Sequence, residues 1–585
     1  MVGDEGAYAA GPGLDEWWPI AEVASQVARI GSARGTRWVI WSASSTLRGV
    51  LDRGVAVPRT WDLAEAHRLL HGGWWATPGH VWAACRGLAA QDVPLPRVGR
   101  HAAFREDLFE AAHTQDDRLL TPTGHLRADA LTGRGGTQSE DHSREHREDL
   151  RRLAAMALDC QRSQEDSIRR HGGSAAERMV RAVWSESAAA VLCVELERDG
   201  LPVDRLAAED LIGAAAGPRP ADDADAARIR AARDHAVLRH APGRERTDLR
   251  NPAQVRELLQ SVGVDVPNTR AWVLEPYRLS HPLVDALLTW RKDERIATTY
   301  GYRWLDECVG DDDRLRGAWT ACDGAAGRMT AENGLHNLPA PLRPAIRATQ
   351  GHVFVRADLG QIEPRVLAVV SGDRAFAEAT RSDDLYAPVA AKLGVERPVA
   401  KVAVLAAMYG QRSGAAGEAL HDLERAYPVA MRLLDRAYAD GVARRPLRTY
   451  GGRLITFGAP TPDADSTAAD GSGGPGNEPS GIRDPAAANA ARGRYARNAI
   501  IQGSAAELFK AWAATVRHAV RPLGGQIVLC LHDELLVHVP ESAARDARAA
   551  VEAALASAGR AWAGTDQVRF VADTSIIRRW SEAKG

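Results

Sequence analysis

The stretch from His352 to Arg365 constrains the fold most, because it joins a buried strand directly to a helix. Val353 and Val355 alternate with more polar neighbours at the period of a strand. Pro364 would fall in the first helical turn, where its missing N–H costs nothing, and apolar residues then recur at helical spacing. Asp358 lies where the strand ends. A carboxylate there suits a metal site or a plain turn, and taken alone the stretch slightly favours the turn.

A second stretch, from Arg397 to Gly410, predicts a helix with one continuous stripe of side chains. Its members are spaced by four residues and share a face: Arg397, Lys401, Leu405 and Tyr409. Cations near a helix N-terminus gain nothing from the helix dipole, which favours anions there. A docked anion such as a triphosphate would explain them, and a solvated basic face is the alternative. Lysine is rare in this arginine-rich chain. Of these two cations, only lysine can lose its proton near neutral pH when its surroundings are suitable, whereas arginine stays charged.

A third stretch, Gln526 to Val539, reads as a β-hairpin whose tip is His532-Asp533-Glu534. Burying adjacent carboxylates is costly unless a cation meets them. If this tip lies beside Asp358, three carboxylates converge, and a pair of Mg²⁺ ions, the usual arrangement for in-line phosphoryl transfer, would balance their charge. The alternative is a hairpin with an exposed acidic tip.

A fourth stretch, Arg494 to Lys510, predicts a helix in which Arg494, Asn498 and Gln502 share one face. Such donors suit the minor-groove acceptors that every base pair presents at similar positions. An ordinary polar helix face is the alternative.

Composition sets wider bounds. The 585 residues suggest roughly three or four domains. A net charge of −2 excludes no class of partner, because a basic cleft can hide in a neutral total. The 6 cysteines are scattered without a C-x-x-C pair, which argues against a zinc site or a disulfide framework and fits a reducing cytoplasm. No apolar run is long enough for a membrane span.

Together and in this order, the stretches resemble the A-family DNA polymerases of the bacterial DNA polymerase I type. D-L-G-Q-I-E-P-R is similar to the family's motif A, R-x3-K-x3-L-x3-Y-G to motif B and L-H-D-E to motif C. GRMTAENGLHNLP and R-x3-N-x3-Q-G-S-A-A-E resemble two further family segments. The likeness is closest to actinobacterial bifunctional 3′–5′ exonuclease/DNA polymerases.

The resemblance implies an α+β multidomain fold, a right-hand polymerase behind an α/β exonuclease-like domain. The palm would hold an antiparallel sheet, and the thumb and fingers would be helical. The implied domains are a degenerate exonuclease-like domain at 1–185, the thumb at 186–320, the first part of the palm at 321–373, the fingers at 374–500 and the second part of the palm at 501–585.

The resemblance also implies roles in catalysis. Asp358 and Asp533 would hold two Mg²⁺ ions, or Mn²⁺ in their place, with Glu534 nearby. Arg397 and Lys401 would grip the triphosphate, and Lys401 would be the general acid for pyrophosphate.

Other residues would bind the nucleotide or the DNA. Glu363 would exclude a ribose 2′-hydroxyl, Tyr409 would guard the templating base and Gln361 would support the minor-groove network. Leu405 and Tyr386 stand at nucleotide-contacting positions where the family has an aromatic ring and a histidine. The predicted DNA contacts are Arg328, His336, Asn337, Arg494, Asn498, Gln502 and His532. These differences from the family's residues do not affect a predicted metal ligand.

The N-terminal region departs further from the family. We find no Asp-x-Glu on a strand, and Asp15-Glu16 lies in a leader expected to be a loop. Leu47 sits near the position of the second exonuclease aspartate, and Ala155 lies four residues before Asp159 where a tyrosine is expected. The domain is therefore expected to have no nuclease activity. Residues 126–150, 323–348 and 459–492 are expected to be a surface loop, an ordered loop and a mobile insertion.

The function expected from the sequence is template-directed DNA synthesis by a cytoplasmic, nucleoid-associated monomer that binds primer-template DNA and deoxynucleoside triphosphates and no membrane. A metal-dependent nuclease or phosphoesterase built on the same carboxylates is one alternative. A non-catalytic DNA-binding relative of a polymerase is another.

Overall fold

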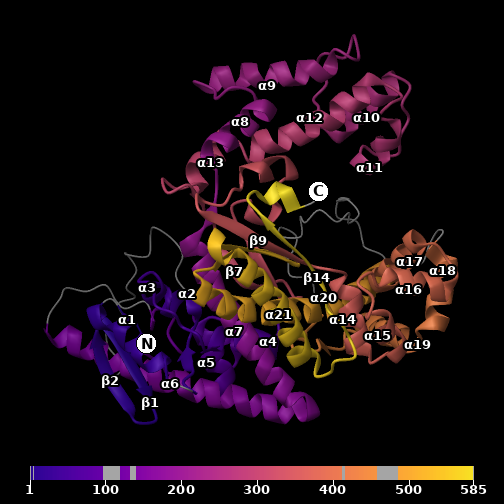
Figure 1. The fold of residues 1–585 in the computed structure, drawn as a ribbon. Helices are drawn as coiled ribbons and strands as arrows, with labels where there is room; N and C mark the ends of the chain where they lie inside the picture. Colours follow the sequence, from indigo (N-terminus) through magenta and orange to yellow (C-terminus); the bar gives the residue numbers. More distant parts are fainter. Residues whose placement is uncertain are drawn as a thin grey trace. The chain divides into compact units, whose positions relative to one another are not determined.

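The computed structural model describes residues 2–3, 5–33, 35–95, 119–131, 140–410, 416–457 and 485–583. The chain forms two compact units (Figure 1). The first comprises Met1–Arg198, Trp319–Thr330 and Val355–Ser575, and the second comprises Asp199–Ala318, Ala331–Phe354 and Ile576–Gly585.

The N-terminal part of the first unit mixes short strands with helices, as predicted. Its elements are β1 (Gly6–Gly11), β2 (Leu14–Pro19), α1 (Ile20–Gly31), β3 (Trp38–Ile40), α2 (Ala43–Thr46), α3 (Arg48–Leu51), β4 (Thr60–Asp62), α4 (Leu63–His71), α5 (Pro78–Arg86), α6 (Glu140–Gly172) and α7 (Ala176–Asp199). Strands β3 and β4 pair in parallel. Helix α6 packs against β1, β3, α4 and α5, over a core that includes Trp41, Trp61 and Leu153.

Four expectations about irregular segments are wrong in part, and two of them concern the N-terminal part. The leader is a hairpin, because β1 and β2 pair antiparallel, with Tyr8 opposite Trp17 and a turn at Pro12-Gly13. Asp15 and Glu16 therefore lie on a strand. The segment expected to be a loop up to residue 150 is helical from Glu140, and from Arg144 to Asp149 its polar residues lie on the exposed or half-buried side of α6. Residues 132–139 lie outside the described part.

The expected ordered loop at 323–348 contains a strand. Strand β8 (Arg328–Ala331) pairs with β7 (Trp319–Asp323), and Gly324 and Gly327 take the positive φ angles of the connecting turn. The expected insertion ends earlier than predicted, because α20 (Pro485–Val520) already includes 485–492. This stretch is rich in alanine and opens on proline, both of which favour a helix start. Residues 459–484 lie outside the described part.

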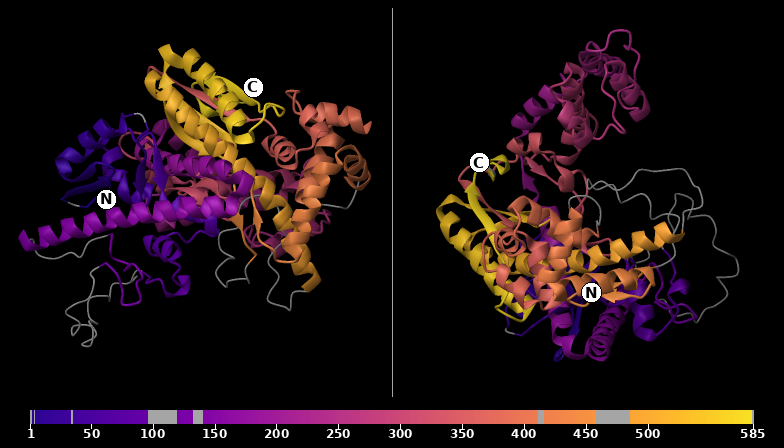
Figure 2. Two further views of the ribbon diagram at one scale, coloured as in Figure 1. Left: turned by 90° about the horizontal axis from the view of Figure 1, so that it is seen from below. Right: turned by 90° about the vertical axis from the view of Figure 1, so that its right-hand side faces the viewer.

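A four-stranded sheet in the order β12-β13-β9-β14 positions the candidate site. Its strands are β9 (His352–Leu359), β12 (Gln526–Leu531), β13 (Glu534–Pro540) and β14 (Ala572–Ile577). The predicted hairpin is confirmed, since β12 and β13 pair antiparallel. Helices α20 and α21 (Ala544–Ala563) pack against each other (Figures 1 and 2). Helix α20 contacts β12, and α21 contacts β13.

Helices follow the strand that carries Asp358. They are α14 (Ile362–Ser371), α15 (Arg374–Ala379), α16 (Tyr386–Leu393), α17 (Arg397–Tyr409), α18 (Ala416–Ala426) and α19 (Pro428–Val442), followed by the small pair β10 (Leu447–Arg448) and β11 (Leu454–Ile455). The predicted helix between Arg397 and Gly410 is confirmed, and Gly410 ends it with a φ of 72°.

The second unit is mainly helical. Its elements are β5 (Leu201–Pro202), α8 (Arg205–Ala216), α9 (Asp223–Leu238), α10 (Pro252–Ser261), α11 (Ala271–Leu274), α12 (Pro282–Thr299), α13 (Tyr302–Cys308) and β6 (Arg314–Leu315). Asn251 caps α10, accepting hydrogen bonds from Ala253 N and Gln254 N, ahead of Pro252 at the first helical position. The hydrophobic core of the second unit includes Leu259, Leu274 and Leu287.

The predicted domain boundaries at 185/186 and 500/501 fall inside the continuous helices α7 and α20. The division into thumb, palm and fingers stays a prediction. None of the helices in the described ranges is both long enough and apolar enough to cross a membrane.

Candidate active site

The end of β9 and the tip of the β12–β13 hairpin lie beside each other. Leu359 N donates a hydrogen bond of 2.9 Å to the carbonyl oxygen of Asp533. His532 and Asp533 form the turn of the hairpin, and His532 takes a positive φ of 52°. The chain therefore brings Asp358 and Asp533 to adjoining positions, although 174 positions separate them in the sequence.

Asp533 carries an unusual carboxyl group. Burial, with smaller contributions from the charges of Glu363 and Asp358, raises its pKa to about 7 against the opposing charge of Arg328. A bound cation would favour the charged form of such a carboxyl group and so lower its pKa.

A buried arginine that the sequence analysis missed lies among the acids. The Arg356 guanidinium donates to Asp358 at 2.6 Å and to Glu534 at 2.7 Å, and its side chain is 2% exposed. The expected mutual repulsion of three carboxylates is therefore balanced in part by the chain itself. The position of Arg356 two residues before Asp358 on a strand was a signal for this contact, because alternate residues share a face.

The turn between β9 and α14 is held by side chains of motif A. Gln361 takes a positive φ of 55°, donates to Asp384 at 2.8 Å and accepts from Leu385 N at 2.8 Å. Arg365 is fully buried and donates to main-chain carbonyl oxygens, including those of Gly360 and Thr380. These contacts fix the direction in which the chain leaves Asp358.

Glu363 receives two partners from distant elements. Arg328 Nη2 on β8 lies 3.3 Å from Glu363 Oε1, and the Tyr409 hydroxyl at the end of α17 donates to Oε2 at 3.2 Å. Burial raises the pKa of Glu363, and Arg328 and Tyr409 oppose the shift. The same burial and the charge of Glu363 raise the pKa of Tyr409 to about 12, so that its hydroxyl keeps the proton that it donates.

The stripe predicted on α17 lies on its more accessible side. Arg397 and Lys401 are exposed, Leu405 is half-buried and Tyr409 is exposed, whereas Ala403, Val404, Ala407 and Met408 are buried. Arg397 already has an acidic partner, since its Nε and Nη2 donate to Asp384 at 2.5 and 3.2 Å. Tyr386 is buried at the start of α16, with the Arg397 guanidinium 5.8 Å from its ring centre.

The three side chains predicted to share a face of α20 do so. Arg494 is exposed, and Asn498 and Gln502 are half-buried, whereas Arg497 is buried and donates to the carbonyl oxygen of Ala407 at the end of α17. Two further predicted DNA contacts, His336 and Asn337, lie in the second unit, where His336 is buried and Asn337 is exposed.

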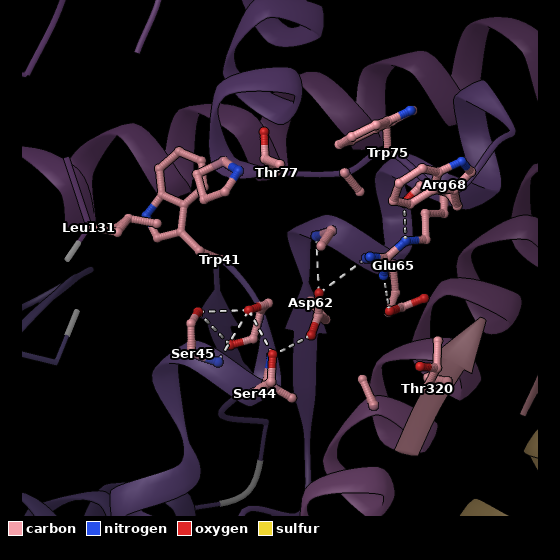
Figure 3. A pocket seen from close by; sticks show the side chains of 18 of the residues that line it. Trp41, Ser44, Ser45, Asp62, Glu65, Arg68, Trp75, Thr77, Leu131 and Thr320 are labelled. Carbon is pink, nitrogen blue, oxygen red and sulfur yellow. Dashed lines mark hydrogen bonds and ion pairs between the residues drawn. The ribbon is translucent and has the colours of Figure 1, made fainter. Parts of the chain in front are cut away.

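A separate cavity of about 480 Å³ lies in the N-terminal part of the first unit, lined by Trp41, Asp62, Glu65 and Trp75 among others (Figure 3). Its acids are already engaged. Asp62 caps α4 by accepting from Ala64 N and Glu65 N, and its second oxygen accepts from Ala43 N at 2.7 Å. Glu65 pairs with Arg68. Asp159, near the third expected exonuclease position, lies at the surface and pairs with Arg162.

Among the residues with described positions, no three or more His, Cys, Asp or Glu side chains form a ready-made metal site. Mg²⁺ nevertheless needs only one or two carboxylates when substrate phosphates and water complete its shell. Asp358 and Asp533 supply two such hard oxygen donors at adjoining positions, and the raised pKa of Asp533 marks an incompletely balanced charge. The donor set at the end of β9 fits this metal.

Comparisons with curated proteins find bacterial DNA polymerases. The chain is 31% identical over 290 residues to DNA polymerase I of Chloroflexus aurantiacus, covering 46% of this chain and 30% of the relative. It is 28% identical over 348 residues to the thermostable DNA polymerase I of Thermus filiformis, covering 54% and 38%. The chain thus matches only 30% to 38% of the length of these relatives.

A solved structure shows the same fold. The POL domain of Pol1 from M. smegmatis, in complex with DNA primer-template and dNTP, aligns with 98% of this chain and 92% of its own, at a TM-score of 0.60 and 20% identity. The model of DNA polymerase family A matches residues 228–436 and 478–582, which is more than half of the chain and includes Asp358, the α17 stripe and Asp533. With its motifs assembled in one unit, the chain belongs to DNA polymerase family A.

Proposed function

We propose that this chain is a template-directed DNA polymerase that adds deoxynucleotides to a primer 3′-hydroxyl. The observation that carries the proposal is the meeting of Asp358 and Asp533 at the end of β9, linked by the hydrogen bond from Leu359 N to Asp533 O. Membership of DNA polymerase family A supports it. Primer-template DNA and deoxynucleoside triphosphates are the proposed substrates, and a monomer is the proposed state.

Asp358 and Asp533 would hold two Mg²⁺ ions. When bound, the ions would activate the primer hydroxyl and stabilise the charge that develops on pyrophosphate. Arg397 would exchange its carboxylate partner Asp384 for the triphosphate, since a guanidinium pairs with either anion in the same fork geometry. Lys401, one turn further along α17 and exposed, would give the proton at Nζ to the leaving pyrophosphate.

Sugar and base selection would fall to the group around Glu363. Its carboxylate is held in place by Arg328 and by the Tyr409 hydroxyl, so its position is set from two other elements. A rigid carboxylate beside the incoming sugar would leave no room for a 2′-hydroxyl. Arg494, Asn498 and Gln502, on the accessible face of α20, would contact the minor groove.

The N-terminal part would have no 3′–5′ exonuclease activity. Both carboxylate oxygens of Asp62 accept main-chain N–H groups and Glu65 Oε1 pairs with Arg68, so of the oxygens of these two acids only the buried Glu65 Oε2 is without a hydrogen-bond partner in the cavity of Figure 3, which is too few for a pair of metal ions. A labelled primer incubated with the protein and Mg²⁺, without nucleotides, should keep its length. Shortening of the 3′ end that Glu65→Gln abolishes would show a working nuclease.

Primer extension tests the polymerase proposal. Wild-type chain, a primed template, Mg²⁺ and all four deoxynucleotides should give extended products, and Asp358→Ala should abolish them. Asp15→Ala is a suitable control, because Asp15 lies on the N-terminal hairpin and pairs with Arg151 and Tyr8 at the surface. It should extend the primer as the wild type does.

A further inference from the structure

The guanidinium of Arg356 binds three carboxylates with three different nitrogen atoms. Its Nε donates to Glu534 Oε1 at 2.7 Å, Nη1 to Asp573 Oδ2 at 3.1 Å and Nη2 to Asp358 Oδ2 at 2.6 Å. The arginine side chain is only 2% exposed, whereas Asp573 is 76% exposed. We call this set, Arg356 with Asp358, Glu534 and Asp573, the arginine clamp.

The order of the sheet explains why these four residues meet. Arg356 and Asp358 lie two residues apart on β9 and therefore point to the same face. Strand β9 lies between β13, which begins at Glu534, and β14, which carries Asp573. The clamp thus joins the three strands directly beside the candidate metal ligands.

The clamp places a permanent positive charge at the site. A guanidinium keeps its proton at any pH at which the protein is folded, and its planar fork fixes the direction of the carboxylates that it binds. A cation bound by Asp358 must share that carboxylate with Arg356. Such sharing weakens the attraction for the metal, because two like charges a few ångströms apart repel in a partly buried site.

We propose that Arg356 is a positioning residue that fixes Asp358 and lowers the affinity of the site for divalent cations, and that Glu534 holds Arg356 instead of binding metal. This inference rests on the proposed function, since it concerns the same metal ligands. The inference separates Glu534 from Asp533 although the two are adjacent, because Glu534 Oε1 accepts a hydrogen bond from the buried Arg356. Arg356 would act through Asp358 and would not touch the substrate.

The test is Mn²⁺ binding by the full chain without DNA or nucleotide, measured from the electron paramagnetic resonance signal of free Mn²⁺. Arg356→Met keeps the length of the side chain and removes its charge, so it should bind Mn²⁺ about tenfold more tightly than the wild type. Arg356→Lys keeps the charge and should stay within about threefold of the wild type. Arg548→Met, at a surface pair with Glu552 on α21, is the control for loss of an arginine and should change nothing.

Unchanged or weaker Mn²⁺ binding by a folded Arg356→Met protein would overturn the inference. If that variant does not fold, Glu534→Gln decides, because the amide can still accept the bond from Arg356 Nε. It should keep the number of bound Mn²⁺ ions, with an affinity within about threefold of the wild type. Loss of a bound ion in Glu534→Gln would make Glu534 a metal ligand and overturn the inference.

The metal part of the proposed function has its own test. If the Asp533→Asn variant binds Mn²⁺ as tightly as the wild type does, Asp533 holds no metal. The proposed function and the inference then fall together. If Asp533→Asn weakens binding but Arg356→Met does not strengthen it, only the inference falls.

Discussion

Asp533 shows how much of the chemistry depends on the surroundings of one carboxyl group. In the unfolded chain an aspartate loses its proton near pH 4, whereas burial and the nearby Glu363 hold the proton of folded Asp533 up to about pH 7. The stability that this proton confers is therefore complete below about pH 4 and is lost as the pH rises to about 7. A metal that binds the charged Asp533 carboxylate would stabilise the folded state at higher pH and oppose this loss of stability.

Asp533→Asn should make this linkage visible. In the absence of metal, the variant should gain stability over the wild type as the pH rises from 5 to 8, by about 2 kcal/mol in the free energy of unfolding by urea. Mg²⁺ should reduce the gain above pH 7, because it stabilises only the wild type. Burial also raises the pKa of Asp62 to about 7, so the difference between the two proteins is the quantity to measure. A difference that does not depend on pH would contradict the raised pKa of Asp533.

Glu363 makes a second test at the level of a residue. Its carboxylate is 13% exposed and is held by Arg328 and Tyr409. Glu363→Ala should open space beside the sugar and lower the preference for deoxynucleotides over ribonucleotides by about tenfold to a hundredfold in kcat/KM. Single-nucleotide incorporation with matched dATP and ATP measures the ratio. An unchanged preference would remove Glu363 from sugar selection.

Helix α17 is the element that most clearly separates a polymerase from a nuclease. Its stripe combines two exposed cations with Leu405 and Tyr409, and Gly410 ends the helix beside Arg494 of α20. A nuclease built on Asp358 and Asp533 would have no use for the triphosphate contacts that we propose for this helix face. The contact of Arg397 with Asp384 also shows that this face attracts anions.

Lys401→Ala should therefore lower the rate of nucleotide addition by about a hundredfold to a thousandfold at saturating nucleotide, because the leaving pyrophosphate loses its proton donor. Single-turnover incorporation followed by rapid quenching gives this rate. Lys392→Ala is the matched control, since Lys392 is exposed on the neighbouring helix α16. Phosphoester cleavage that survives Lys401→Ala while extension is absent in both proteins would favour the nuclease alternative.

The elements around the site could be predicted from the sequence because each has a strong local signal. Alternating valines gave the strand before Asp358, spacing by four gave the α17 stripe, and two apolar runs gave the hairpin at Asp533. The full set of partners of Arg356 could not be predicted in this way, although its position two residues before Asp358 pointed to their contact. Its partner Asp573 is 217 residues away, and the neighbours of β9 in the sheet depend on tertiary pairing. The N-terminal hairpin and the start of α6 were not predicted, because these segments contain many polar residues and their apolar residues show only a weak strand or helix periodicity.

Over the first unit as a whole, a buried charge cluster joins distant parts of the chain. Glu186 on α7 pairs with Lys510 on α20 at 2.6 Å and with Arg453 before β11 at 2.7 Å, and all three side chains are 1 to 2% exposed. Burial opposes ionisation of Glu186, but the two cations outweigh it and lower the pKa of this carboxyl group. The cluster ties the N-terminal part to the helix that supports β12.

Lys510→Met should destabilise the protein by about 3 kcal/mol, because it leaves the Glu186 charge with Arg453 as its one remaining cation in the cluster. Unfolding by urea, followed by circular dichroism, measures the loss. Lys392→Met should cost less than about 1 kcal/mol, since that lysine is exposed and lies over the ring of Tyr427. Equal stability of the two variants would mean that the buried cluster does not hold the unit together.

The most direct test of the whole account compares primer extension by the wild type and by Asp533→Ala on the same primed template with Mg²⁺ and all four deoxynucleotides. The wild type should extend the primer to the end of the template. Asp533→Ala should give no extended product while it folds and binds the primed template as the wild type does. Extension by Asp533→Ala at the wild-type rate, or no extension by the wild type, would contradict the assignment of Asp358 and Asp533 as the centre of a DNA polymerase.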